Sequence, residues 1–143
     1  MSLTDQDKTT VRAFWNLASG KADLFGGEAL TRMILLYPGT RAYFPDWKDF
    51  TPKSAPVKKH VKELITGINT AIAQIDNLSE AMADLGNLHA KVLKVDFVYM
   101  KNMSDCLLLG LAVVFPKEFT PEVNMSMFKF LEAMNAAIGE KYT

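Results

Sequence analysis

The two histidines of this chain, His60 and His89, are the side chains best suited to metal chemistry. His89 lies in the apolar stretch 85–90, at the edge of a face on which apolar residues recur at spacings of three and four. A neutral imidazole on such a face needs a partner for each ring nitrogen, because an unpaired polar group costs roughly 1–3 kcal/mol. A metal is one such partner. The alternative is a core histidine bonded to a backbone carbonyl.

Other chemistries lack residues that they require. The histidines do not have the His-Glu-x-x-His spacing of a zinc hydrolase, and no carboxylate is placed to complete such a centre. No serine is flanked by the glycines of a nucleophile elbow, and Gly20-Lys21 lacks the upstream glycine of a phosphate-binding loop. An iron porphyrin uses both histidines, since one imidazole can ligate the iron while the other lies over the opposite face.

The composition predicts one domain, residues 1–143, with a full hydrophobic core. Hydrophobic residues make up 49% of the chain, and 16 Lys and Arg balance 16 Asp and Glu, so nucleic acid is not an expected partner. The longest apolar run, 106–115, is too short to span a membrane, and the first residues do not resemble a signal peptide. The lone Cys106 excludes an internal disulfide and a covalently attached haem.

Apolar periodicity predicts an all-α fold. Thr4 and Asp7 form a predicted capping box at the first helix, and Thr120-Pro121 begins the last. The expected helices cover about residues 4–18, 21–37, 54–75, 78–92, 98–115 and 120–138, with an aromatic corner at 41–53. Leu24 is expected to face inward on the second of them. His60 and His89 lie on consecutive helices, so their rings could face each other across a slot.

Several motifs resemble those of vertebrate haemoglobin α chains, most like those of bony fishes. The resemblance runs from Ser2 to Tyr142 and is specific because the motifs occur together. They are Tyr43-Phe44-Pro45, Val57-Lys58-Lys59-His60, Leu88-His89-Ala90, Val95-Asp96 and Phe115-Pro116-Lys117-Glu118-Phe119-Thr120-Pro121-Glu122. The implied fold is the globin fold, a single domain of seven to eight helices packed around a haem pocket.

The resemblance implies a non-covalent haem b whose iron is ligated by His89. His60 would be the distal hydrogen-bond donor, and Phe44 would wedge the porphyrin. A dry apolar pocket would also slow oxidation of the iron. The complete set of expected pocket residues is Tyr43, Phe44, Trp47, His60, Leu64, Ile68, Leu85, Leu88, His89, Leu93, Val95, Met100, Met103 and Ile138.

The implied function is reversible binding and transport of O2, with CO and NO as further ligands, by a carrier that is not an enzyme. The implied partners are β-type globin chains in an α2β2 tetramer, and the implied location is the cytosol of red blood cells. The alternative is a six-coordinate globin for redox or nitric oxide chemistry, in which His60 binds the iron directly. A five-coordinate ferrous iron favours the carrier.

Some positions depart from the α-chain pattern inside the pocket. Val61 replaces the glycine that usually follows the distal histidine, and Gly26 is expected to make room across the helix crossing. Leu64 replaces the usual valine, so the ligand side should be tighter and ligand entry slower. Asp46 and Glu63 stand where basic residues usually lie near the haem propionates, which predicts weaker retention of haem unless nearby lysines compensate.

Other departures affect the expected subunit contacts. Family α chains usually end in Tyr-Arg and pair that arginine with an aspartate in the last helix. Here the last residues are Tyr142-Thr143, and Phe128 occupies the aspartate position. The corner after the proximal segment also changes, to Phe97, Tyr99 and Met100. Because such contacts set the balance of quaternary states in haemoglobin, the sequence predicts weak cooperativity and a small pH effect.

Overall fold

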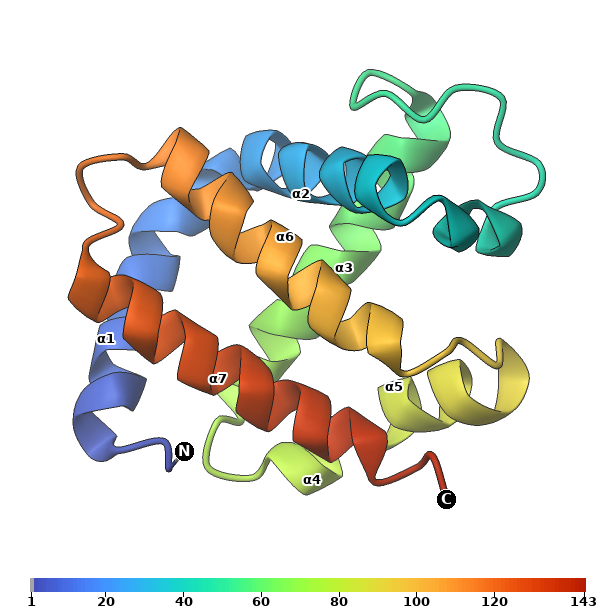
Figure 1. Cartoon of the computed structure of the whole chain (residues 1–143). Helices are drawn as coiled ribbons and strands as arrows, with labels where there is room; N and C mark the ends of the chain where they lie inside the picture. Colours follow the sequence, from blue (N-terminus) through green and yellow to red (C-terminus); the bar gives the residue numbers. More distant parts are fainter. Residues whose placement is uncertain (1) are drawn as a thin grey trace.

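The computed structural model describes residues 2–143, and every regular element in that range is helical (Figure 1). The elements are α1 (Asp5–Ala18), η1 (Ser19–Lys21), α2 (Ala22–Leu36), η2 (Pro38–Tyr43), α3 (Ala55–Ala73), α4 (Leu78–Ala81), α5 (Ala83–Asn87), η3 (Leu88–Val92), α6 (Val98–Val114) and α7 (Pro121–Gly139). The expected all-α fold is confirmed. Over the same residues, no helix combines the length and the hydropathy that a membrane crossing requires.

The helix ends follow local side-chain chemistry. The Thr4 hydroxyl accepts the Asp7 N–H at 3.0 Å, and the Asp7 carboxylate accepts the Thr4 N–H at 2.9 Å, which completes the predicted capping box. The Thr120 hydroxyl accepts the Val123 N–H at 3.3 Å and caps α7 in the same way. Pro38 begins the short η2, because its fixed φ suits a first helical position.

The single helix predicted over 78–92 is wrong, since the structure divides it into α4, α5 and η3. Met82 separates the first two pieces, with φ −98° and ψ 3°. The last piece, η3, is π-helical, and the Leu93 N–H reaches the Leu88 carbonyl at 2.8 Å, one residue further back than in an α-helix. A π-helical turn shifts the side chains that follow it around the axis. Val92 belongs to the predicted apolar stripe, but it is 70% exposed at the end of η3 and lines the cavity described below.

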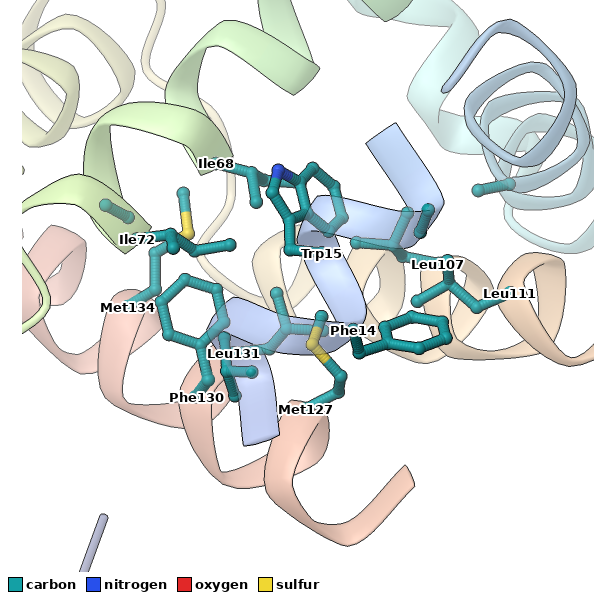
Figure 2. Close-up of a cluster of buried hydrophobic side chains, with 14 of the residues drawn as sticks. Phe14, Trp15, Ile68, Ile72, Leu107, Leu111, Met127, Phe130, Leu131 and Met134 are labelled. Atoms are coloured by element: carbon teal, nitrogen blue, oxygen red, sulfur yellow. The ribbon is translucent and has the colours of Figure 1, made fainter. Parts of the chain in front are cut away.

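The main core lies where α1, α3, α6 and α7 meet (Figure 2). The labelled side chains in that view are Phe14, Trp15, Ile68, Ile72, Leu107, Leu111, Met127, Phe130, Leu131 and Met134. Trp15 satisfies its buried indole N–H by donating to the Asn69 side-chain oxygen at 2.7 Å. Leu24 was expected inside, but it is 61% exposed because α2 turns its glycines and Phe25 inward instead.

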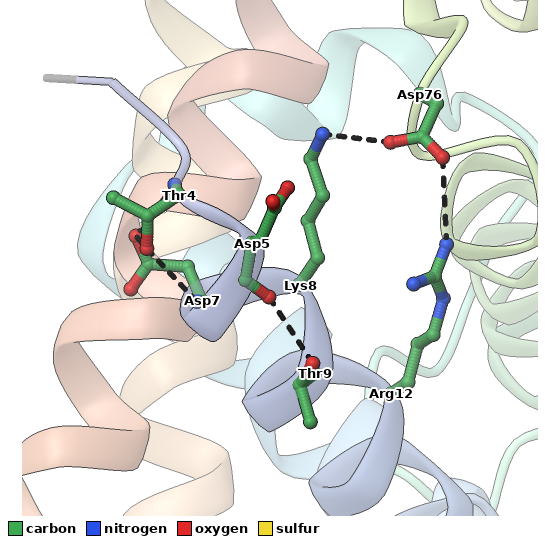
Figure 3. Close-up of polar contacts among 7 residues, drawn as sticks. All are labelled: Thr4, Asp5, Asp7, Lys8, Thr9, Arg12 and Asp76. Carbon is green, nitrogen blue, oxygen red and sulfur yellow. Dashed lines mark hydrogen bonds and ion pairs between the residues drawn. The ribbon is translucent and has the colours of Figure 1, made fainter.

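Asp7 ties α1 to α7. Its carboxylate accepts the Ser126 hydroxyl at 2.8 Å and pairs closely with Lys129. Figure 3 shows the start of α1, where the Asp7 carboxylate also accepts a hydrogen bond from the Thr4 hydroxyl. In the same view Asp76 pairs with Lys8 at 2.7 Å and approaches Arg12 at 3.9 Å, so α1 is also linked to the chain after α3.

Replacing Asp7 with Asn should remove an acid-sensitive part of the stability. The Lys129 ammonium, followed by hydrogen bonds from Thr4 and Ser126, holds the pKa of Asp7 well below its ordinary 3.8. A lowered folded-state pKa contributes stability above the unfolded value, and this contribution disappears as the pH falls through the folded value. Urea unfolding should therefore separate wild type from Asp7→Asn at pH 7, and the gap between them should begin to narrow as the pH falls below about 4.

Asp5→Asn is the matched control, because this exposed carboxylate lies in the same helical turn. Its unfolding midpoint should follow that of the wild type closely at each pH. A constant gap between wild type and Asp7→Asn from pH 7 to pH 3 would contradict the assignment.

Candidate cofactor pocket

A cavity of about 520 Å³ lies between α3, the α5–η3 segment and the inner faces of α6 and α7, with η2 at one side. Its walls are largely apolar, and its volume is within the range of pockets that enclose most of a small molecule. It is lined by both histidines and by methionines from α2, α6 and α7. The cavity can therefore enclose a cofactor that is largely apolar.

His89 lies in the π-helical segment η3, with its side chain lining this cavity. Its Nδ1 atom is 2.8 Å from the Leu85 carbonyl oxygen, one turn earlier. A carbonyl oxygen only accepts, so Nδ1 carries the proton in this bond and Nε2 keeps a lone pair. This arrangement fixes the tautomer and the ring angle of a metal ligand. His89 thus fits the role of a single iron ligand.

His60 lines the same cavity from α3. Burial lowers the pKa of His60 below its ordinary 6.5, and the Glu63 carboxylate opposes that change. The Nδ1 atom of His60 is 3.4 Å from a carboxylate oxygen of Glu63. His60 is therefore a neutral imidazole at neutral pH, with one nitrogen that donates and one that accepts.

Aromatic side chains hold His60 on its outer side. Phe44 meets the His60 ring edge-on at 4.9 Å between centroids and 71° between planes. Trp47 stacks on Phe44 at 4.1 Å and 18°, and lies 5.9 Å from His60. The Trp47 indole also packs against a second buried cluster between α2 and α3. These two ring contacts restrict how the His60 imidazole can turn.

Comparison with known proteins agrees with this geometry. A family model described as Globin matches residues 27–138. The chain is 49% identical to the haemoglobin subunit alpha-1 of Anarhichas minor, over 99% of both chains. It is 47% identical to the haemoglobin embryonic subunit alpha of Oryzias latipes, over 99% of this chain and 98% of that one. It is also 47% identical to the haemoglobin subunit alpha of Salmo salar, over 99% of both.

The chain belongs to the haemoglobin α-subunit group of the globin family. These relatives match 99% of the chain, so the resemblance inferred from the sequence motifs is confirmed over nearly its whole length. The cavity supports it independently, because its two histidines stand on the elements that the motifs indicate.

The structure brings together nearly all of the residues that the sequence predicted for the pocket of this globin. The cavity is lined by every one of them except Trp47. Trp47 lies outside the lining because its indole stacks on Phe44 and packs into the second cluster with Phe50. Trp47 therefore influences the pocket through its ring contacts with Phe44 and His60.

Several lining residues were missed in the sequence. Leu30, Met33, Leu107, Leu131 and Met134 have apolar spacings that predict burial, but no local signal shows that a cavity adjoins them. The others are Thr40, Ala42, Glu63, Gly67, Val92, Tyr99, Ser104 and Asn135. Glu63 was expected only near the propionates.

Two of the missed residues, Ser104 and Asn135, form a polar pair on α6 and α7. The Asn135 amide donates to the Ser104 hydroxyl at 2.9 Å and to the Met100 carbonyl at 3.3 Å. The Asn135 side-chain nitrogen therefore has two acceptors on α6, and these bonds link α6 to α7 beside the cavity.

The close crossing of α2 and α3 has the predicted form. A Cβ atom on Gly26 would lie 2.5 Å from Cγ1 of Val61, nearer than real Cβ contacts allow. Gly26 therefore makes the room that Val61 takes up. Val61 directly follows His60 on α3, so the crossing lies next to this histidine.

Proposed function

We propose that this chain binds O2 reversibly at a haem b ligated by His89, as the α-type subunit of a tetramer with β-type chains in the red-cell cytosol. The observation that carries the proposal is the bond between His89 Nδ1 and the Leu85 carbonyl inside a cavity shared with His60. Haem supplies a ferrous iron that takes O2, CO or NO reversibly. The protein is a carrier, not an enzyme.

The other side chains bind, orient and exclude water. Leu64, Ile68 and Leu85 line the cavity with hydrocarbon, which keeps water out and favours a neutral, uncharged interior. Leu64 is bulkier than the valine usual at its position, so it narrows the space beside His60. His60 supplies the polar group on this side, and an N–H directed at the cavity favours O2 over the less polar CO.

Glu63 opposes this use of His60. A carboxylate oxygen can only accept, so at 3.4 Å it favours a proton on Nδ1 and leaves a lone pair on Nε2. The Glu63 side chain is 60% exposed, and solvent screening limits such a pair to about 0–1 kcal/mol. Glu63→Gln should therefore raise O2 affinity by up to about fivefold.

CO affinity should barely change in Glu63→Gln, because CO accepts hydrogen bonds weakly. The control is Glu122→Gln, which removes an exposed carboxylate in the first turn of α7. Oxygen and carbon monoxide titrations of the isolated haem-loaded chain measure both effects. Equal shifts for O2 and CO would show that Glu63 acts on the haem as a whole rather than on His60.

Trp47→Leu should make ligand entry faster. The change removes the indole from Phe44 and His60, and an aromatic pair contributes about 0.5–1.5 kcal/mol beyond its buried area. The conformation in which the His60 ring is turned away from the cavity should then become roughly two- to tenfold more populated. CO association after flash photolysis should quicken by the same factor. Phe50→Leu, which touches Trp47 but makes no ring contact with His60, should change it less than twofold.

The finer part of the proposal is that cooperativity is weak. Phe128 stands where family α chains have the bridging aspartate. The proposed β-type partner has separate support from exposed apolar side chains on helices that pack together. They are Leu35 and Leu36 on α2, Leu109 and Val113 on α6, and Met125 on α7. With a β-type chain we expect a Hill coefficient well below the 2.8–3 of haemoglobin. A strongly sigmoidal oxygen curve would contradict this part alone.

The test of the main proposal is the visible absorption spectrum of the ferrous haem-loaded chain. A five-coordinate spectrum that changes reversibly on addition of O2 is the expected result. A low-spin six-coordinate spectrum without ligand would place His60 on the iron, and the redox alternative would then replace the carrier.

A further inference from the structure

The corner between η3 and α6, residues 95–99, continues directly from the segment that carries His89. The Val95 N–H donates to the His89 carbonyl at 2.8 Å. Just before the corner, Lys94 has a φ of 52°, in the left-handed region, and this residue reverses the chain. A shift of the backbone at His89 is therefore transmitted to the corner through this hydrogen bond and the short segment between them.

One side of the corner is fastened to η2. The Asp96 N–H donates to the Tyr43 hydroxyl at 3.0 Å. The Tyr43 and Tyr99 rings meet edge-on, with centroids 5.8 Å apart and planes at 80°. The Tyr99 hydroxyl then lies over Gly39, where a Cβ atom would be 2.5 Å from it. Glycine at position 39 is what allows the Tyr99 ring to lie against η2.

The other side of the corner is fastened to the end of α7. The Phe97 and Tyr142 rings pack at 5.0 Å between centroids, with 60° between their planes. A Cβ atom on Gly139 would lie 2.9 Å from Phe97 Cζ. The corner thus places one aromatic ring against a glycine on each side. Phe97 and Tyr99 are both departures from the usual α-chain sequence, so these two contacts belong to this chain.

We infer that the corner is a clamp inside the subunit, which joins η2 and the end of α7 to the segment that carries His89. The three segments then open and close as one unit. The clamp engages the Tyr43 hydroxyl and the Asp96 N–H within one chain, while Phe97 stays 39% exposed. It deepens the proposed function, because it gives a structural cause for weak cooperativity, but its test uses no oxygen binding.

The test is hydrogen exchange, followed by mass spectrometry, in the haem-loaded chain with CO. Gly39→Ala should speed exchange about tenfold in η2 and also in residues 139–143, since overpacking pushes Tyr99 away and opens the whole clamp. In a Tyr99→Phe background, Gly39→Ala should change the exchange rates less than twofold. The hydroxyl is then absent, and the nearest remaining ring atom, Cζ, is 3.7 Å from the added carbon.

Phe97→Ala tests the clamp from the other side. It should speed exchange in residues 139–143 and, through the corner, in η2. The control Leu109→Ala alters an exposed position on α6 and should leave both segments unchanged. If Gly39→Ala speeds exchange in η2 alone and Phe97→Ala speeds it in 139–143 alone, the contacts are independent and the clamp is refuted. The absorption spectrum of each sample reports haem loading separately, so failure of the carrier function is distinguishable.

Discussion

Replacing His89 with glycine should abolish haem retention and O2 binding while the helical fold persists. The imidazole that lines the cavity is the one polar group of η3 directed to it with a free nitrogen. Loss of a group that merely orients a metal ligand costs 10–100-fold in affinity, so loss of the ligand should speed haem transfer to apomyoglobin by at least roughly 100-fold. The glycine itself costs only about 1 kcal/mol of helix stability.

Imidazole added to the His89→Gly protein should restore a five-coordinate ferrous spectrum, because the removed side chain leaves a space of the same shape. His60→Leu is the matched control, since it removes the other histidine of the cavity. That protein should keep its haem and its five-coordinate spectrum, and lose its preference for O2 over CO. If His60→Leu releases haem while His89→Gly keeps it, the two roles are reversed.

Features decided by local chemistry could be predicted from the sequence. The capping box at Thr4 and Asp7, the cap at Thr120 and the turn at Pro38 each depend on residues within three positions of one another. The two histidines were also identifiable, because an imidazole on an apolar helix face demands a partner. These signals place the ends of the helices and the two sides of the pocket.

Features that depend on contacts far apart in the chain could not be predicted. Apolar spacing marks a buried face, but it is the same whether that face meets the core or a cavity, and Leu88 at 42% exposure meets the cavity. The π-helical turn at His89 and the withdrawal of Trp47 behind Phe44 depend on tertiary packing. The pair Ser104 and Asn135 gave no signal, because single polar residues within helices are common.

Gly26→Ala should destabilise the chain by about 1–3 kcal/mol, the usual cost of overpacking. The added carbon would lie 2.5 Å from Cγ1 of Val61, and neither side can yield easily. Val61 is 2% exposed, and a β-branched side chain in a helix has one preferred rotamer. Thermal or urea unfolding measures the loss. Gly20→Ala is the control, because nothing lies within 4 Å of a Cβ atom there.

The pair can be separated from other causes by a double-mutant cycle. In a Val61→Ala background, Gly26→Ala should cost less by about 1 kcal/mol or more, since residues in direct contact couple by 0.5–3 kcal/mol. Equal costs in both backgrounds would show that Gly26 is needed for another reason. The same variants also test an effect on ligand binding, because Val61 follows His60 on α3. Gly26→Ala alone should therefore shift CO association, and Val61→Ala should bring it back toward the wild-type rate.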